Sequence, residues 1–231
     1  MFFTFRRLLV ATLLSAASAT SVAAQATQPT ESKEAAYTRT ITERAAKIVA
    51  TLGLSDEGKT TKVRDVITNQ YRQLNDVHEA RKAQLAVLKA QPKDDKTEAA
   101  TKKIEDQTTA ALDKLHGKYL KQLGRYLTPT QVDMVKDGMT YRVLPITMTA
   151  YEDMLPSLTA EQKAQMLAWL TEAREHAMDA STSEQKHAWF GKYKGRINNY
   201  LSAAGIDMNQ AGKDWQARIA ARKAADATGT H

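Results

Sequence analysis

The sequence predicts an all-α protein. Apolar residues recur along almost the whole chain at the spacing of one helix face, as in Ile41, Ala45, Ile48 and Leu52. No segment alternates apolar and polar residues for long enough to build a sheet, and the sequence contains no solenoid repeat. We therefore expect a long N-terminal antiparallel helical hairpin packed with a compact C-terminal helical cluster.

Residues 1–24 have the pattern of a secretory signal peptide. Arg6 and Arg7 supply a positive start, an apolar stretch follows, and small residues lead up to a cleavage point near Ala24. The apolar stretch is too short to span a bilayer, although an N-terminal membrane anchor is the alternative interpretation. The mature protein is expected to be periplasmic or secreted, with no stable membrane insertion after cleavage.

The composition restricts the classes of function. The chain has no Cys, which excludes disulfides, thiolate nucleophiles and Cys-ligated metal sites. The formal net charge is +7, and removing Arg6 and Arg7 with the signal peptide leaves +5. In an exported protein this charge favours acidic glycans, anionic surfaces or acidic polypeptides over nucleic acid as partners. A solvated surface with a small excess charge is an equally good interpretation.

Helix start and stop signals divide the mature chain into elements. We expect residues 25–34 to be a disordered lead-in and residues 35–225 to be a single all-helical domain. Gly53 ends the first helix, and Ser55 caps a second, long helix. A Pro-containing turn and a return helix complete a helical arm, which covers residues 35–126.

An aromatic-rich helical cluster is expected over residues 127–225. Gly138, Pro145 and Pro156 interrupt the helical pattern, so short helices and a loop should come first. Ser183 is the expected N-cap of the helix that carries most of the aromatic residues. The longer helices are expected near residues 160–180, 184–203 and 208–224.

Two copies of Leu-Thr-x-x-Gln mark helix starts in this half of the chain. Thr128 and Thr159 can each accept from the amide three residues further on, while Gln131 and Gln162 reach back to the threonine amide. This reciprocal pair is a capping box, and ordinary helix starts explain it. The motif is also similar to that of the Spy-like periplasmic chaperones, which are small all-helical dimers.

Residues 186–201, which we call the aromatic–basic segment, are the least ordinary part of the sequence. The segment mixes Trp, Phe and Tyr rings with Lys and Arg and contains no acidic residue. On a helical wheel, Phe190, Ile197 and Leu201 share a face that should enter the core. The side chains on the flank of that face have apolar bodies and polar tips: Trp189, Tyr193, Arg196 and Tyr200.

A half-exposed flank of this kind suits a sugar that carries a carboxylate, because rings stack on the sugar while a guanidinium pairs with the acid. The alternative is an ordinary core, since aromatic residues at helical spacing are commonly buried. The predicted ligand-binding residues are Trp189, Tyr193, Arg196, Tyr200, Lys192, Lys194, Asn198 and Asn199, with Tyr141, Arg142 and Tyr151 completing the rim.

The sequence lacks recognisable catalytic, cofactor and metal motifs. Its His residues are scattered, without the His-Glu-x-x-His spacing of a metal site. His176 lies one helical turn from Glu172 and Asp179, where surface pairing is the expected role. We predict no catalytic residue, no metal and no cofactor, and the question of enzymatic activity stays open.

Three runs of residues resemble domain-of-unknown-function family 3826. They are residues 41–54, which begin Ile-Thr-Glu-Arg, residues 136–141, which read Lys-Asp-Gly-Met-Thr-Tyr, and the aromatic–basic segment. The resemblance covers roughly residues 35–217. It implies an exported protein of polysaccharide-degrading bacteria that is described as sugar-binding, and it implies no catalytic residues.

The predicted function is therefore non-catalytic binding of carbohydrate in polysaccharide utilisation, with acidic plant-type glycan fragments as the ligand. The alternatives are a Spy-like periplasmic chaperone and a polysaccharide lyase or hydrolase of unrecognised type. Exposed apolar area on the hairpin would favour the chaperone, and a pocket in the C-terminal half would favour the glycan binder. The pattern predicts neither the oligomeric state nor the identity of the glycan.

Overall fold

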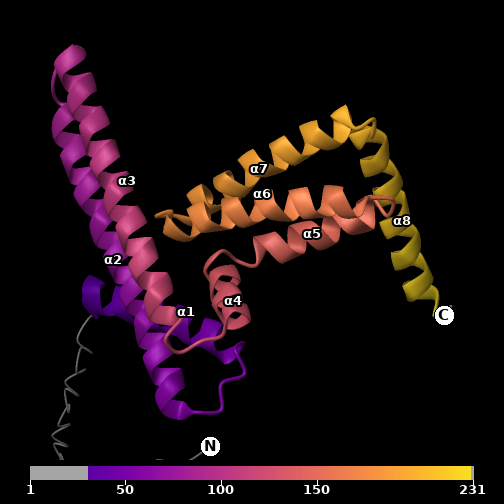
Figure 1. The fold of residues 1–231 in the computed structure, drawn as a ribbon, viewed down its shortest axis with the longest axis horizontal. Helices are drawn as coiled ribbons and strands as arrows, with labels where there is room; N and C mark the ends of the chain where they lie inside the picture. Colours follow the sequence, from indigo (N-terminus) through magenta and orange to yellow (C-terminus); the bar gives the residue numbers. More distant parts are fainter. Residues whose placement is uncertain (1–30, 230–231) are drawn as a thin grey trace, which may run out of the picture.

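The computed structural model describes residues 31–229, and this part of the chain forms eight α-helices and no strand (Figure 1). The all-α prediction is confirmed. The predicted signal peptide, residues 1–24, lies outside the described residues. Among the described helices, none combines the length and the apolar character needed to cross a membrane. The helices are α1 (Lys33–Ala50), α2 (Glu57–Lys89), α3 (Asp95–Leu123), α4 (Pro129–Met139), α5 (Val143–Met154), α6 (Ala160–Asp179), α7 (Ser183–Ala203) and α8 (Met208–Thr228).

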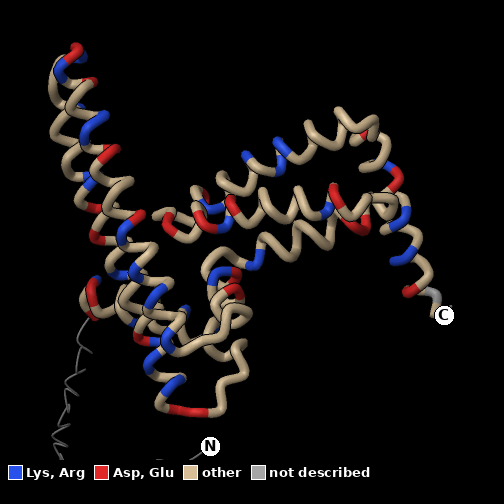
Figure 2. Tube along the Cα trace, viewed as in Figure 1, with Lys and Arg blue, Asp and Glu red and all other residues tan. Residues whose placement is uncertain are grey.

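The predicted N-terminal hairpin is formed by α2 and α3. The 33 residues of α2 make it about 50 Å long. The buried residues of α2 end at Leu74, and those of α3 are Tyr119 and Leu123, close to its C-terminus. The distal part of the hairpin therefore projects beyond the other helices (Figure 1). Basic and acidic residues are interspersed along this projecting part, as expected for helices that face solvent (Figure 2).

Both Leu-Thr-x-x-Gln motifs begin helices, as predicted. Thr128 and Thr159 accept from the amides of Gln131 and Gln162, at 3.3 and 3.2 Å. The Gln side chains accept in return from the threonine amides, at 3.1 and 2.9 Å. The two capping boxes are therefore complete at the starts of α4 and α6.

Three other helix starts differ from the prediction by one or two residues. The carboxylate of Asp56 accepts from the Lys59 amide at 2.6 Å, a charge-assisted bond that outcompetes the hydroxyl of Ser55. The lead-in predicted over residues 25–34 includes the first residues of a helix, because α1 begins at Lys33. The observed N-caps are Ser32 for α1, Asp56 for α2 and Thr182, in place of Ser183, for α7.

A first hydrophobic core joins α1 and α4 to the near ends of α2 and α3. Ala45, Val63 and Ile67 are fully buried at its centre. Gly138 lets α4 approach α1 closely, because a Cβ at this position would lie 2.8 Å from Cγ1 of Ile48. This contact explains a glycine in the last turn of a short helix.

A second hydrophobic core joins α5, α6 and α7. Phe190, Ile197 and Leu201 are fully buried here, as the helical wheel predicted, and they share the core with Met166 and Leu170 of α6. The C-terminal cluster is elongated rather than compact. Its helices extend sideways from the hairpin, and α8 crosses their far end (Figure 1).

The division between the two cores falls after α4 rather than at residue 127, except that Met178 of α6 is buried in the first core. Val135 and Met139 of α4 are buried in the first core, and Leu144 of α5 is buried in the second. Helical periodicity shows that a helix has an apolar face but not which core receives it, so the sequence assigned α4 to the C-terminal cluster.

Ion pairs between α4 and α6 connect the two cores. Arg174 of α6 is buried and donates to Asp133 and Asp137 of α4, at 2.6 and 2.8 Å. Lys136 of α4 donates to both carboxylate oxygens of Glu175 at 2.9 Å. Arg174 is the buried member of its pairs, so loss of both carboxylates would leave its charge uncompensated. The pairs therefore set the orientation of α6 against α4.

Candidate functional site

The aromatic–basic segment lies on α7, but one of its rings is enclosed. Tyr193 has 5% of its surface exposed and belongs to the second core, so the expectation of a half-exposed ring at this position is wrong. Burial, followed by a hydrogen bond with Glu172, raises the pKa of Tyr193 to about 12. The physical reason is that α5, α6 and α8 all pack against α7, which makes its buried face wider than one stripe.

The outer flank of α7 forms a row of paired side chains with α6. Trp189 stacks on His176, with ring centroids 4.4 Å apart and planes within 17°. Further along, the guanidinium of Arg196 lies 4.4 Å from the centre of the Trp169 ring. Trp169 in turn meets Tyr200 edge-on at 5.3 Å. These predicted ligand-binding groups already have partners within the protein.

The remaining predicted residues of α7 are exposed, whereas Tyr151 contacts one of them from the buried side and does not form an exposed rim. The Tyr151 ring is buried in the second core, and its hydroxyl donates to Oδ1 of Asn198 at 2.6 Å. The Lys192 ammonium lies 5.3 Å from the centre of the Trp189 ring. The exposed residues of this group are Lys192, Lys194, Asn198 and Asn199.

Tyr141 and Arg142 lie elsewhere, at the junction between α4 and α5. Their φ angles are 58° and 57°, in the left-handed region that residues other than Gly seldom occupy. The Arg142 amide donates to the Asp137 carbonyl at 2.7 Å, and Tyr141 stacks on His187 of α7 with centroids 5.5 Å apart. Such a conformation costs about 1–3 kcal/mol per residue and is concentrated at functional sites.

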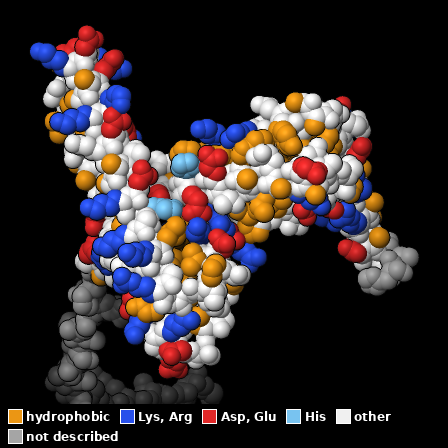
Figure 3. Space-filling model, in the orientation of Figure 1, with side chains coloured by type: hydrophobic (Ala, Val, Ile, Leu, Met, Phe, Trp, Pro, Cys, Tyr) orange, Lys and Arg blue, Asp and Glu red, His pale blue; other side chains and the backbone are white. Residues whose placement is uncertain are grey.

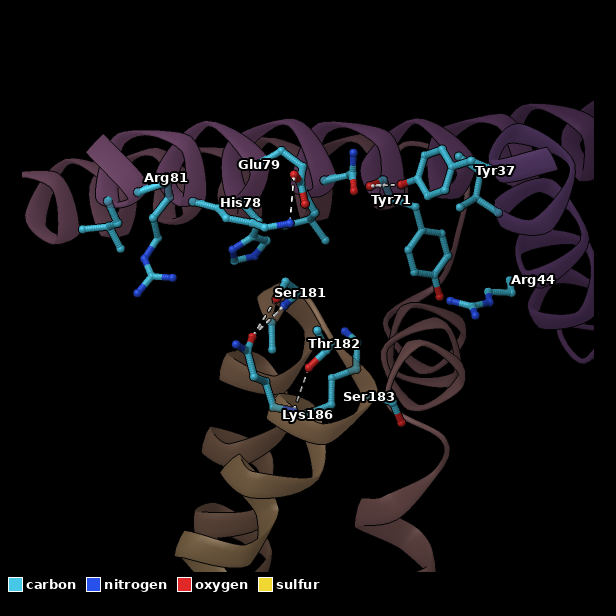
Figure 4. A pocket seen from close by; sticks show the side chains of 18 of the residues that line it. Tyr37, Arg44, Tyr71, His78, Glu79, Arg81, Ser181, Thr182, Ser183 and Lys186 are labelled. Carbon is cyan, nitrogen blue, oxygen red and sulfur yellow. Dashed lines mark hydrogen bonds and ion pairs between the residues drawn. The ribbon is translucent and has the colours of Figure 1, made fainter. Parts of the chain in front are cut away.

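A cleft opens at this junction, between the first core and the start of α7 (Figure 4). It consists of two adjoining cavities with volumes of about 750 and 540 Å³, which we together call the junction cleft. Volumes of this size are typical of small-molecule sites. Four residues line both cavities: Arg44, Tyr71, Tyr141 and Lys186.

The junction cleft has an excess of positive charge. Within the described residues, Arg44, Lys47 and Arg142 line the smaller cavity without an acidic partner. The acidic residue in the same wall, Asp137, is already engaged by Arg174 at 2.8 Å. Unpaired cations in a concave site attract anions, so the charge favours an acidic ligand.

Lys186 and Tyr71 form the inner walls of the cleft. The Lys186 ammonium donates to the carbonyls of Ala177 and Met178, at 2.8 and 3.0 Å, where α6 ends. Burial lowers the pKa of Lys186 to about 8 and raises the pKa of Tyr71 to about 12. In Figure 4 the Tyr71 hydroxyl and the Arg44 guanidinium point toward one another. The walls thus offer a neutral phenol beside fixed cations.

A separate cluster of titratable groups lies where α3 meets α6. His116 contacts Asp179 at 2.7 Å and Glu175 at 3.2 Å, one carboxylate at each ring nitrogen. Hydrogen bonds to both carboxylates raise the pKa of His116 to about 9. Burial acts to raise the pKa of Glu175, but hydrogen bonds from His116 and Lys136 lower it to about 2. His116 is therefore a structural cation at neutral pH, and Asp179 pairs with it rather than with His176.

Sequence reasoning missed Arg44, Lys47, Tyr71 and Lys186 as lining residues of one cleft. Tyr71 carried one signal, because it is an isolated aromatic residue in the Ala- and Lys-rich front half of the mature chain. Lys186 begins the aromatic–basic segment but was not among the predicted ligand-binding residues. Arg44 and Lys47 carried no such signal, since Lys and Arg are ordinary on helix surfaces. Within residues 31–229, no three His, Asp or Glu side chains are placed to hold a metal ion.

Comparison with known families gives one match. The family described as protein of unknown function (DUF3826) matches residues 38–221, so the chain belongs to that family. No curated protein matches the chain. The description of the family names no ligand or reaction, so a function has to be argued from the geometry of the cleft.

Proposed function

We propose that this member of the DUF3826 family is a non-catalytic carbohydrate-binding protein that recognises acidic glycan fragments in the junction cleft. One observation carries the proposal: Arg44, Lys47 and Arg142 face a cavity of about 540 Å³ without acidic partners among the described residues. A carboxylate satisfies such groups well, because a guanidinium can donate two parallel hydrogen bonds to its oxygens.

Tyrosine rings supply the part of the site that suits a sugar rather than an inorganic anion. Tyr71 and Tyr141 line both cavities, and 45% of the surface of Tyr141 is exposed. An aromatic ring has an apolar face for the C–H side of a sugar and, in Tyr, a hydroxyl for its polar rim. The backbone strain at Tyr141 and Arg142 supports the same assignment, since it holds both side chains at the cleft.

The proposal includes a location outside the cytoplasm. The pattern of residues 1–24 supports export, with cleavage near Ala24, so that the mature chain is periplasmic or secreted. An exported binder of acidic oligosaccharides would act in polysaccharide utilisation, and it requires no nucleic acid, no metal and no cofactor.

The position of exposed apolar side chains does not favour a chaperone. Among the described residues, the large hydrophobic side chains that are most exposed are distributed over four elements, and only Val87 lies on the hairpin. A chaperone surface on the hairpin would need a contiguous apolar patch there. The full set is Val87, Tyr141, Ile146 and Leu167.

Binding to a panel of acidic and neutral polysaccharides tests the proposal, with release of unsaturated or reducing ends measured in the same samples. Arg44→Gln and Arg142→Gln should each weaken binding of an acidic fragment about tenfold or more, since a charged hydrogen bond contributes about 1.5–3 kcal/mol. The loss should shrink at high salt. Lys114→Gln, which removes an exposed charge from α3, is the matched control and should bind as wild type.

Three results would contradict the proposal. Absence of binding to every acidic glycan of the panel would refute the proposal. Binding that survives both arginine substitutions but is lost in Arg196→Gln would return the site to the outer flank of α7. Released unsaturated or reducing ends would establish the lyase or hydrolase alternative.

A further inference from the structure

A third cavity, of about 280 Å³, lies beside the junction cleft, between the hairpin and the α6–α7 pair. The hydrogen bond of 2.7 Å between Nε2 of His78 and the Asp179 carbonyl joins the hairpin to the end of α6 between them. His176 and Trp189 line this cavity, and their stacked rings form one of its walls. The third cavity and the larger cavity of the junction cleft share four lining residues: His78, Arg81, Ala180 and Gln185. We call the three cavities together the extended groove.

The extended groove is longer than a single sugar ring. It follows α2 from Tyr71 at the junction cleft to Arg81 at the third cavity, which is about 15 Å of helix. A ligand that uses both ends must therefore be a chain of several units. The space-filling view shows side chains of His and of acidic residues gathered where the hairpin meets α6 and α7 (Figure 3).

The two ends of the extended groove differ in charge. Arg44, Lys47 and Arg142 at one end lack acidic partners within residues 31–229. At the other end Arg81 is neutralised by Glu105, with hydrogen bonds of 2.7 and 2.5 Å. Asp179 also lines the third cavity but is paired with His116 at 2.7 Å, so Asp113 is the carboxylate of this lining that would repel an acidic sugar.

From this asymmetry we infer that the ligand is a mixed oligosaccharide, with an acidic unit in the junction cleft and a neutral unit in the third cavity at Trp189. The inference rests on the proposed function. Trp189 contributes the apolar area of its indole ring that the stacked His176 and the Lys192 ammonium, 5.3 Å from the ring centre, leave uncovered. Trp189, which the sequence predicted as a ligand-binding residue, thus provides specificity for the neutral unit, while the cations of the junction cleft bind the acid.

Calorimetry with three probes tests the inference: galacturonic acid, an oligogalacturonide tetramer, and a tetrasaccharide that alternates galacturonic acid with rhamnose. The mixed tetrasaccharide should bind about tenfold more tightly than the monosaccharide. The uniformly acidic tetramer should gain less, because its later units meet Asp113 and an Arg81 that Glu105 already neutralises. Trp189→Ala should abolish the gain of the mixed tetrasaccharide and leave the affinity for the monosaccharide within about twofold of wild type.

A second variant controls for misfolding of Trp189→Ala, because Trp189 packs against the second core. His176 is exposed, so His176→Ala removes the stacking partner without opening that core, and it should reduce the same gain. Equal affinity for the two tetramers, or a gain that survives both substitutions, would overturn the inference while leaving the proposed function in place. If no acidic ligand of any length binds, the inference and the proposed function fall together.

Discussion

Replacing His116 with Gln tests the ion cluster that joins α3 to α6. The unfolded chain binds a proton at the ordinary imidazole pKa of 6.5, whereas Asp179 and Glu175 raise the pKa in the folded protein to about 9. The folded state therefore holds the proton more tightly. The resulting stability is fully present below pH 6.5 and is lost as the pH rises toward 9.

The size of this effect follows from the two pKa values. A shift from 6.5 to about 9 corresponds to about 3 kcal/mol in total. The His116 side chain is 19% exposed, so solvent screens the pairs only partly. Between about pH 6 and pH 8 the contribution of His116 should fall by about 2 kcal/mol. From pH 8 upward, deprotonation of Lys186 increases the stability instead, because its pKa falls from 10.5 to about 8 on folding. The comparison therefore ends at pH 8.

Urea unfolding of the wild type and of His116→Gln at a series of pH values measures the difference. The wild type should lose about 2 kcal/mol more than the variant between about pH 6 and pH 8. His187→Gln is the matched control, because His187 is exposed on α7 and outside the cluster, and it should follow the wild type. A variant that loses stability with pH as steeply as the wild type would refute the assigned role of His116.

Three further predictions concern local geometry. Gly138→Ala should lower the free energy of unfolding by about 1–3 kcal/mol in thermal unfolding, because its Cβ would lie 2.8 Å from Cγ1 of Ile48. The cost should be smaller in an Ile48→Ala background. Additive effects of the two substitutions in a double-mutant cycle would disprove the contact. Arg142→Gly should raise the melting temperature, through relief of about 1 kcal/mol of strain at φ 57°, and should weaken acidic-glycan binding in calorimetry; a fall in stability would show that the strain argument fails. Thr159→Ala should cost about 1 kcal/mol in denaturant unfolding by removing one half of the capping box with Gln162, and a neutral result would show that the box contributes nothing to α6.

The sequence was sufficient for the class of fold and for most helix limits, because these depend on neighbours within one or two turns. Apolar spacing, Gly53 and the two capping boxes at Thr128 and Thr159 are local signals, and the structure agrees with them. The shift of a cap from Ser55 to Asp56 is equally local, since both residues can accept the same class of bond. Errors of this kind move an element by a residue and leave the fold unchanged.

The sequence also identified α7 as the helix that carries the core of the C-terminal half. It does not show how many other helices pack against α7. Phe190 and Tyr193 are both buried because α5, α6 and α8 surround α7, whereas a helical wheel assumes one covered face. Tyr141 and Arg142 were singled out together with Tyr151, yet they lie at the strained junction after α4 while Tyr151 enters the second core.

Only the tertiary structure decided where charge is left unpaired. Arg44, Tyr71 and Lys186 come from three different helices, and nothing in the sequence indicates that they line one cleft. The same limit applies to His116, whose partners on α6 are far away along the chain. Local sequence specifies hydrogen bonds and periodicity within a helix, but burial, pairing and pKa depend on which helices meet. Those contacts exist only after the two cores have packed together.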